Sequence, residues 1–187
     1  DGSGHPGDRR AGHAEMISES ILRHLNAQGT SARLNALREA ARSADFPPMD
    51  RRYINNHIHT NYSFSPYSPS AAVFAARMEG LCTAGIVDHD TIAGAEEFIQ
   101  AGQIIGLPVT VVIEARVLMA GTSFERLRTN NPDQEGVSYM VLHAVPHRNI
   151  TAVQAYFAPL REARGRRNRM MLENVNRLTG LGLDYER

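Results

Sequence analysis

Two stretches of this chain, His57-Ile58-His59-Thr60 and Gly85-Ile86-Val87-Asp88-His89-Asp90-Thr91, decide how the fold is interpreted. Each comes at the end of a short apolar or β-branched segment, so residues 53–58 and 82–87 are expected to be strands. Between them, Ser68 and Pro69 begin a helix that runs to about residue 79. Because residues two apart on a strand point to the same face, the two imidazoles of the first stretch should face one space.

The alternation of strands and helices continues toward the C-terminus. Residues 109–115 and 137–145 are expected to be two further strands, and a helix over 91–105 separates the second strand from the third. This order implies parallel pairing with crossover helices. In such sheets, functional sites gather at the carboxyl ends of the strands. The sequence therefore predicts an α/β fold with its site at the strand ends, followed by a helix over 151–178.

All four expected strands carry a side chain that can bind metal at or near their ends: His57 and His59, Asp88 and His89, Glu114, and His143. A single histidine in such a place is usually structural, and Asp88 alone could cap the next helix. A carboxylate in an apolar strand is costly without a cation or a proton, which makes Glu114 the least ordinary of the set. Their coincidence favours a metal centre. Imidazole and carboxylate ligands without thiolate suit zinc, iron or manganese, and two or three divalent ions are expected because a glutamate can bridge a pair.

These residues, in this order, resemble the PHP (polymerase and histidinol phosphatase) family, and most closely its single-domain metal-dependent phosphoesterases. The resemblance rests on four stretches: residues 57–60 with Ser63, residues 85–91, Ile113-Glu114 after Gly106, and Val141-Leu142-His143. It implies a distorted barrel of seven βα units that hydrolyses phosphate esters at a site of two or three metals. Carried over, it assigns His57 and His59 to one metal, Glu114 to a bridge, His143 to the second metal and His89 to a third. Asp88 becomes a neighbouring ligand or a carboxylate that orients an imidazole, and Asp88 and Glu114 are the catalytic candidates.

The sequence departs from the family pattern in two places. Phe64 follows Ser63 where the family has an aspartate that helps to hold the third metal. After His143 there is no Asp-x-His motif, with which the family completes its site on a late strand. We therefore expect the N-terminal part of an incomplete distorted (β/α)7 barrel. The remainder of a longer polypeptide, or a partner chain, would complete it.

The last expected helix is rich in arginine: Arg161, Arg164, Arg166, Arg167 and Arg169. Most such runs are solvated helix faces, but a guanidinium fork also binds phosphate. Arg164 and Arg167 share a helix face, and both are candidates for contact with a substrate phosphate. Arg116 is a third candidate, because it points to the same face as Glu114 if the strand continues.

The composition excludes several other classes of protein. All 20 basic residues of the 187 are arginine, so a Schiff-base enzyme and a lysine-bearing phosphate loop are excluded. The 20 acidic residues balance them, and a single cysteine excludes a disulfide framework. With neither an apolar run that could span a membrane nor a signal-peptide core, the sequence predicts a cytoplasmic location without membrane attachment.

Three segments are expected along the chain: a disordered or artificially added start at 1–12, a helical appendage at 13–48, and a PHP-like metal-binding domain at 50–187. The expected function is hydrolysis of a small-molecule phosphomonoester, a nucleotide or a short oligonucleotide by metal-bound hydroxide. A catalytically degenerate PHP domain that binds metal for a structural or interaction role is the alternative. A metal-dependent amidohydrolase ranks lower, because such enzymes usually bridge their metals with a carboxylated lysine, and this chain has no lysine.

Overall fold

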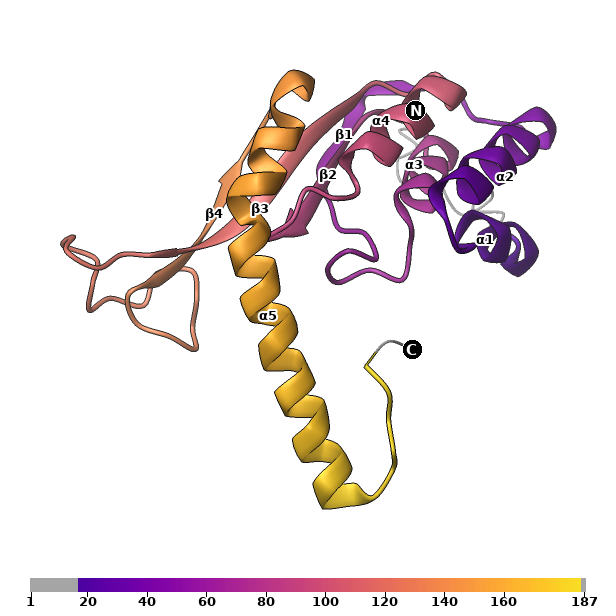
Figure 1. Cartoon of the computed structure of the whole chain (residues 1–187). Coiled ribbons are helices and arrows are strands. Elements are labelled where there is room, and N and C mark those ends of the chain that lie inside the picture. The colour runs from indigo at the N-terminus through magenta and orange to yellow at the C-terminus, as the bar shows by residue number, and fades with distance from the viewer. Residues whose placement is uncertain (1–16, 186–187) are drawn as a thin grey trace, which may run out of the picture.

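The computed structural model describes residues 17–185. Within them the chain forms, in order, the elements α1 (Glu19–Leu25), α2 (Thr30–Ser43), β1 (Asp50–Ile58), α3 (Pro69–Met78), β2 (Leu81–His89), α4 (Ala95–Ile105), β3 (Val109–Leu118), β4 (Val137–Leu142), a 3-10 turn at His147–Asn149 and α5 (Ile150–Thr179). Figure 1 shows a curled sheet with helices α1 to α4 gathered beside it and α5 crossing it. The predicted mixed α/β fold is confirmed, and these four strands correspond to part of a barrel.

The four strands lie in sequence order, β1-β2-β3-β4. The first three are parallel, as the intervening helices predict, but β4 runs antiparallel to β3. No helix lies between β3 and β4; residues 119–136 form an irregular connection instead. Without a crossover element to carry the chain back along the sheet, the next strand pairs antiparallel. The parallel pairing expected for the fourth strand is therefore wrong, although the carboxyl end of β4 still lies beside the site, with Val141 opposite Glu114.

Helices α1 and α2 share a hydrophobic core with the rest of the fold. Leu25 and Leu37 are completely buried, in one cluster with Phe74 of α3 and Phe98 of α4. The helical character expected for residues 13–48 is thus present from Glu19 to Ser43. A domain boundary near residue 50 stays a prediction, although the core is continuous across it. The expected start at 1–12 lies outside the described residues.

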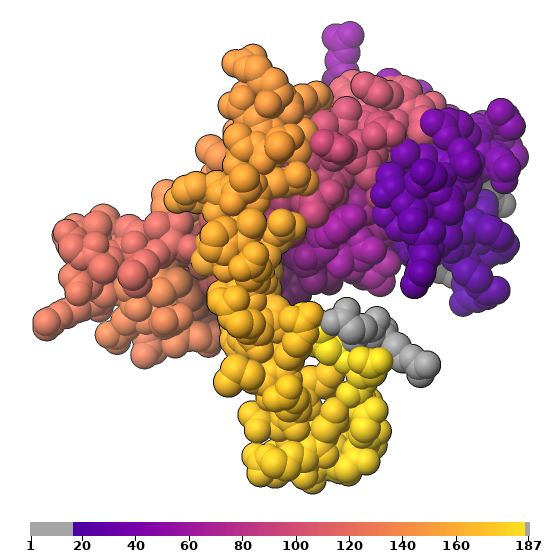
Figure 2. Space-filling model, in the orientation of Figure 1, coloured from indigo at the N-terminus to yellow at the C-terminus, as the bar shows by residue number. Residues whose placement is uncertain are grey.

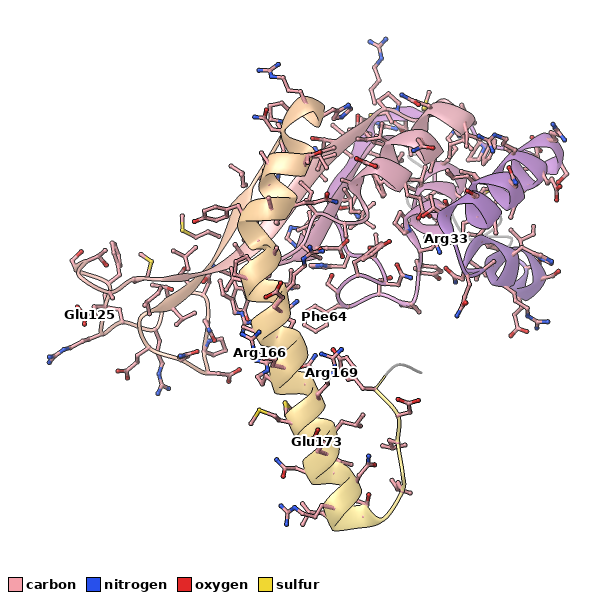
Figure 3. All side chains as sticks on the ribbon, viewed as in Figure 1. Arg33, Phe64, Glu125, Arg166, Arg169 and Glu173 are labelled. Carbon is pink, nitrogen blue, oxygen red and sulfur yellow. The ribbon has the colours of Figure 1, made fainter. Side chains whose placement is uncertain are left out.

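A buried ionic cluster joins α2 to α3 and α4. The Arg33 guanidinium donates to Glu97 through Nε at 2.9 Å, and the Ser70 hydroxyl donates to the same carboxylate at 2.7 Å. Burial raises the pKa of Glu97, but the hydrogen bonds from Arg33 and Ser70 outweigh it, so the pKa lies below its ordinary value. Figure 3 shows Arg33 between the N-terminal helices and the body of the molecule. This cluster fixes α2 against the helices that cover the sheet.

Helix α5 is supported only along its first part. Ile150 and Phe157 are buried, whereas Met171 and Leu178 are well exposed. The helix continues through Pro159 without a break. In Figure 2 its second half stands away from the body as a column. None of the helices in residues 17–185 combines the length and the apolar character needed to cross a lipid bilayer.

Candidate metal centre

The end of β1 brings two histidines to one face of the sheet. His57 lies in β1 and His59 follows it immediately, with a distance of 5.1 Å between the two ring centroids. His57, His59 and Glu114 each offer a ligand atom, and these atoms all lie within 4.8 Å of one another. The alternation of side chains along a strand, from which a shared space was predicted, accounts for this placement.

Strand pairing adds His89 and Glu114 to the same face. In the parallel register between β2 and β3, His89 stands opposite Glu114. The His89 ring stacks on that of His59, with centroids 4.9 Å apart and planes 4° from parallel. The Nε2 atoms of the three histidines converge on the Glu114 Oε2 atom, at 3.7 Å for His57, 3.9 Å for His59 and 3.4 Å for His89. Four of the five ligands expected from the sequence are therefore together.

The surroundings of His89 favour its neutral form. Burial lowers the pKa of the imidazole, and the nearby His59 and Arg164 lower it further, while Glu114 and Asp90 act in the opposite direction. The net pKa lies below the ordinary value for histidine. A neutral imidazole is the form that binds a metal ion.

The donor set and its spacing fit a divalent cation. Two ligand atoms on one tetrahedral ion at about 2.0–2.2 Å lie roughly 3.3–3.6 Å apart. The Nε2–Oε2 distances of 3.4–3.9 Å are close to that range. Three imidazoles and a carboxylate, without thiolate, suit zinc, manganese or iron. The arrangement thus indicates a metal-binding group of His57, His59 and Glu114, with His89 Nε2 3.4 Å from the same carboxylate.

Asp88 lies behind this group and does not belong to it. Its side chain is 1% exposed, and its carboxylate accepts hydrogen bonds from the Thr60 amide at 2.8 Å, the Thr60 hydroxyl at 2.6 Å and the Ser63 hydroxyl at 2.5 Å. A carboxylate engaged in this way faces the turn after β1, not the Glu114 oxygen. These hydrogen bonds hold the turn after β1, as expected of a carboxylate that orients an imidazole, and the catalytic role of Asp88 stays a prediction.

The assignment of His143 to the second metal stays a prediction. Because β4 is antiparallel, Leu142 pairs with Ile113, and the chain continues beside β3, where the Val145 amide donates to the Val111 carbonyl at 2.9 Å. His143 is exposed, and among the described residues the candidate ligand group does not include it. The sequence could not reveal this, because the direction of β4 depends on the connection at 119–136.

We expect His143→Ala to leave the affinity for Zn²⁺ or Mn²⁺ within about twofold of the unchanged chain, whereas His89→Ala weakens it at least tenfold, as loss of a ligand should. Isothermal titration of both variants with each metal checks this. An equal loss for the two substitutions would contradict this expectation and would support His143 as a ligand.

Two aromatic residues border the site: Phe64, which stands where the family has a ligand aspartate, and Tyr139, which the sequence did not identify. Tyr139 of β4 lies with its ring centroid 5.6 Å from that of His89, and it stands opposite Arg116 in the antiparallel register. Phe64 lies edge-on to His89 at 4.8 Å and to His59 at 6.0 Å. Its side chain is 79% exposed, and Figure 3 shows it projecting from the loop that follows β1. Tyr139 could have been identified from the sequence only if β4 had been expected to pair antiparallel to β3.

The three arginines expected to contact phosphate are placed differently from one another. Arg164 donates to the His89 carbonyl at 2.9 Å and to the Asp90 carboxylate at 2.8 Å. Arg116 reaches the same carboxylate at 3.4 Å, and Asp90 itself is buried with a positive φ of 55°. Both guanidinium groups therefore hold the end of β2. Arg167 lies one turn along α5 from Arg164. It is exposed, and its guanidinium donates a long hydrogen bond of 3.4 Å to the Asn168 Oδ1 atom.

Comparisons with known proteins give partial likenesses. No family model matches the chain. Error-prone DNA polymerases from Mycobacterium bovis and Mycobacterium tuberculosis are each 31% identical to it over 140 residues, which is 71% of this chain. The chain spans only 12% of the length of these curated relatives.

Two solved structures share the fold. One is from Bifidobacterium adolescentis and is described provisionally as a metal-dependent phosphoesterase; its TM-score is 0.53 at 24% identity, over 75% of this chain and 43% of that one. The other is an amidohydrolase from Chromobacterium violaceum, with a TM-score of 0.52 at 20% identity, over 67% of this chain and 39% of that one. The likeness shows that the curled sheet and its helices correspond to part of a larger known fold.

Proposed function

We propose that this chain carries the metal site of a PHP-type, metal-dependent phosphoesterase. The observation behind the proposal is the convergence of three imidazole Nε2 atoms on one Glu114 oxygen, at 3.4–3.9 Å. Such a group of acceptors around a carboxylate is stable only with a cation or protons between them. The fold shared with a provisionally described phosphoesterase supports the same conclusion.

The residues of the site have different roles in this proposal. His57, His59, His89 and Glu114 would hold a divalent cation, which when bound supplies Lewis acidity for an anionic phosphate. Arg164 and Arg116 keep Asp90, and with it the end of β2, in place. Arg167, for which residues 17–185 show no carboxylate partner, would bind a substrate phosphate bidentately. The number of ions, two or three, belongs to this proposal.

The substrate proposed is a phosphate ester: a small-molecule phosphomonoester, a nucleotide or a short oligonucleotide. Because the chain spans 43% of the similar phosphoesterase structure, we also propose that further polypeptide completes the barrel around the site. That polypeptide would belong to the same protein or to a partner.

A metal-binding role without catalysis is the second candidate. Phe64 and Tyr139, two aromatic rings, border His89 on sides where a hydrolytic centre could use further ligands. Under this alternative the cation stabilises the fold, and no substrate is turned over.

The deciding experiment measures hydrolysis by the chain loaded with Mn²⁺, Zn²⁺ or Fe²⁺. The panel comprises p-nitrophenyl phosphate, bis-p-nitrophenyl phosphate, nucleoside monophosphates, a short oligonucleotide and an acetylated amide. We expect phosphate-ester hydrolysis that a chelator removes and that Glu114→Gln lacks. Turnover of the amide alone would establish the amidohydrolase alternative. Metal binding without any turnover would favour the structural role.

A further inference from the structure

The turn that follows β1 contacts the Nδ1 side of the His59 ring. The Ser63 amide donates to the Thr60 carbonyl at 2.9 Å, and the Ser65 amide donates to the same carbonyl at 3.2 Å. Thr60 is completely buried and is itself held by Asp88 through both its amide and its hydroxyl. This turn places the Ser63 hydroxyl 3.2 Å from the Nδ1 atom of His59.

The single hydroxyl hydrogen of Ser63 is used in a hydrogen bond to Asp88. The Ser63 oxygen lies 2.5 Å from the Asp88 Oδ1 atom, and an ionised carboxylate only accepts hydrogen bonds. Ser63 must therefore donate to Asp88. Toward His59 it has only lone pairs to offer, so its partner atom Nδ1 must carry a hydrogen.

A neutral imidazole with a hydrogen on Nδ1 has its lone pair on Nε2. In His59 that Nε2 atom is the one that lies 3.9 Å from the Glu114 carboxylate, inside the candidate ligand group. We propose that Ser63, oriented by Asp88, is a positioning residue that fixes the Nδ1–H tautomer of His59 and so presents Nε2 as a metal ligand. The inference rests on the proposed metal site, but it is independent of the reaction catalysed there.

The first test observes the tautomer directly in the metal-free protein. Long-range ¹H–¹⁵N correlation spectra of chain labelled with ¹⁵N-histidine distinguish the two neutral tautomers, and His59→Gln identifies the His59 signals by their loss. With the imidazole neutral, we expect His59 to be the Nδ1–H tautomer. In Ser63→Ala the preference should disappear, and in Ser63→Thr, which keeps a hydroxyl, it should return. An Nε2–H tautomer in the unchanged chain would overturn the proposal without any variant.

The second test measures metal affinity by titration with Zn²⁺ or Mn²⁺ alone. Removing a group that orients a ligating histidine typically weakens binding about 10–100-fold, and we expect Ser63→Ala to do so. Ser65→Ala is the matched control, because Ser65 belongs to the same turn and its hydroxyl accepts a hydrogen bond from the Tyr67 amide at 3.2 Å. Equal affinities for the two alanine variants would contradict the proposal. If the unchanged chain keeps the Nδ1–H tautomer but binds no metal, the proposed function is contradicted, while the role of Ser63 in fixing the His59 tautomer is not.

Discussion

Replacing Glu114 by glutamine is expected to weaken binding of Zn²⁺ or Mn²⁺ by more than about 100-fold, beyond the effect of losing an outer-shell group. The carboxylate oxygen is the one atom that all three imidazoles face, and the amide removes its negative charge while keeping its shape. Titration calorimetry with each metal measures the loss. Metal should also raise the Tm of the unchanged chain, since binding to the folded state alone stabilises it, and should leave the Tm of Glu114→Gln unaltered.

Glu173→Gln is the matched control for this substitution. Glu173 is an exposed residue on the second half of α5, away from the sheet, as Figure 3 shows. The substitution Glu173→Gln removes the same charge from the chain without changing the metal site. Metal affinity should equal that of the unchanged chain. An affinity of Glu114→Gln within threefold of this control would contradict a metal centre at Glu114.

Replacing Arg33 by methionine is expected to destabilise the fold by about 3–5 kcal/mol, because it leaves the buried Glu97 carboxylate without its cation. The two side chains are 10% and 3% exposed, so water cannot take over the lost contact. Chemical denaturation at neutral pH measures the free energy of unfolding. Arg38→Met, on the exposed face of the same helix, should change it little. The double variant Arg33→Met/Glu97→Met should recover most of the loss, since apolar side chains replace the pair together.

The same cluster gives the stability a defined pH dependence. The pKa of Glu97 is lower in the folded chain than in the unfolded one, so its contribution is fully present above the unfolded pKa. That contribution is lost as the pH falls from near 4.5, the ordinary value, through the folded pKa. Unfolding free energies measured from pH 7 downward should therefore fall more steeply for the unchanged chain than for Glu97→Gln. Parallel curves would show that Glu97 is not ionised and paired in the fold.

The sequence predicts the centre of the site because local rules suffice there. His57 and His59 share a face by strand alternation, and the helices on either side of β2 imply the parallel order that brings His89 beside Glu114. The placement of these residues could be predicted without knowing which distant parts of the chain are in contact.

The remaining residues depend on contacts that no local pattern encodes. The antiparallel direction of β4 brings Tyr139 beside His89, and that direction follows from the irregular connection at 119–136. Asp88 resembles a ligand in sequence, but the Thr60 and Ser63 hydrogen bonds turn it away. The docking of α2 likewise depends on the pairing of Arg33 with Glu97, far apart in the chain.

Anomalous diffraction from crystals grown with Zn²⁺ or Mn²⁺, recorded at the absorption edge of the metal, tests the central claim most directly. The account predicts a peak about 2.0–2.3 Å from the Glu114 Oε2 atom and from the Nε2 atoms of His57, His59 or His89, the bond lengths of such ligands. A well-occupied metal elsewhere on the chain, with no peak among these four side chains, would contradict it.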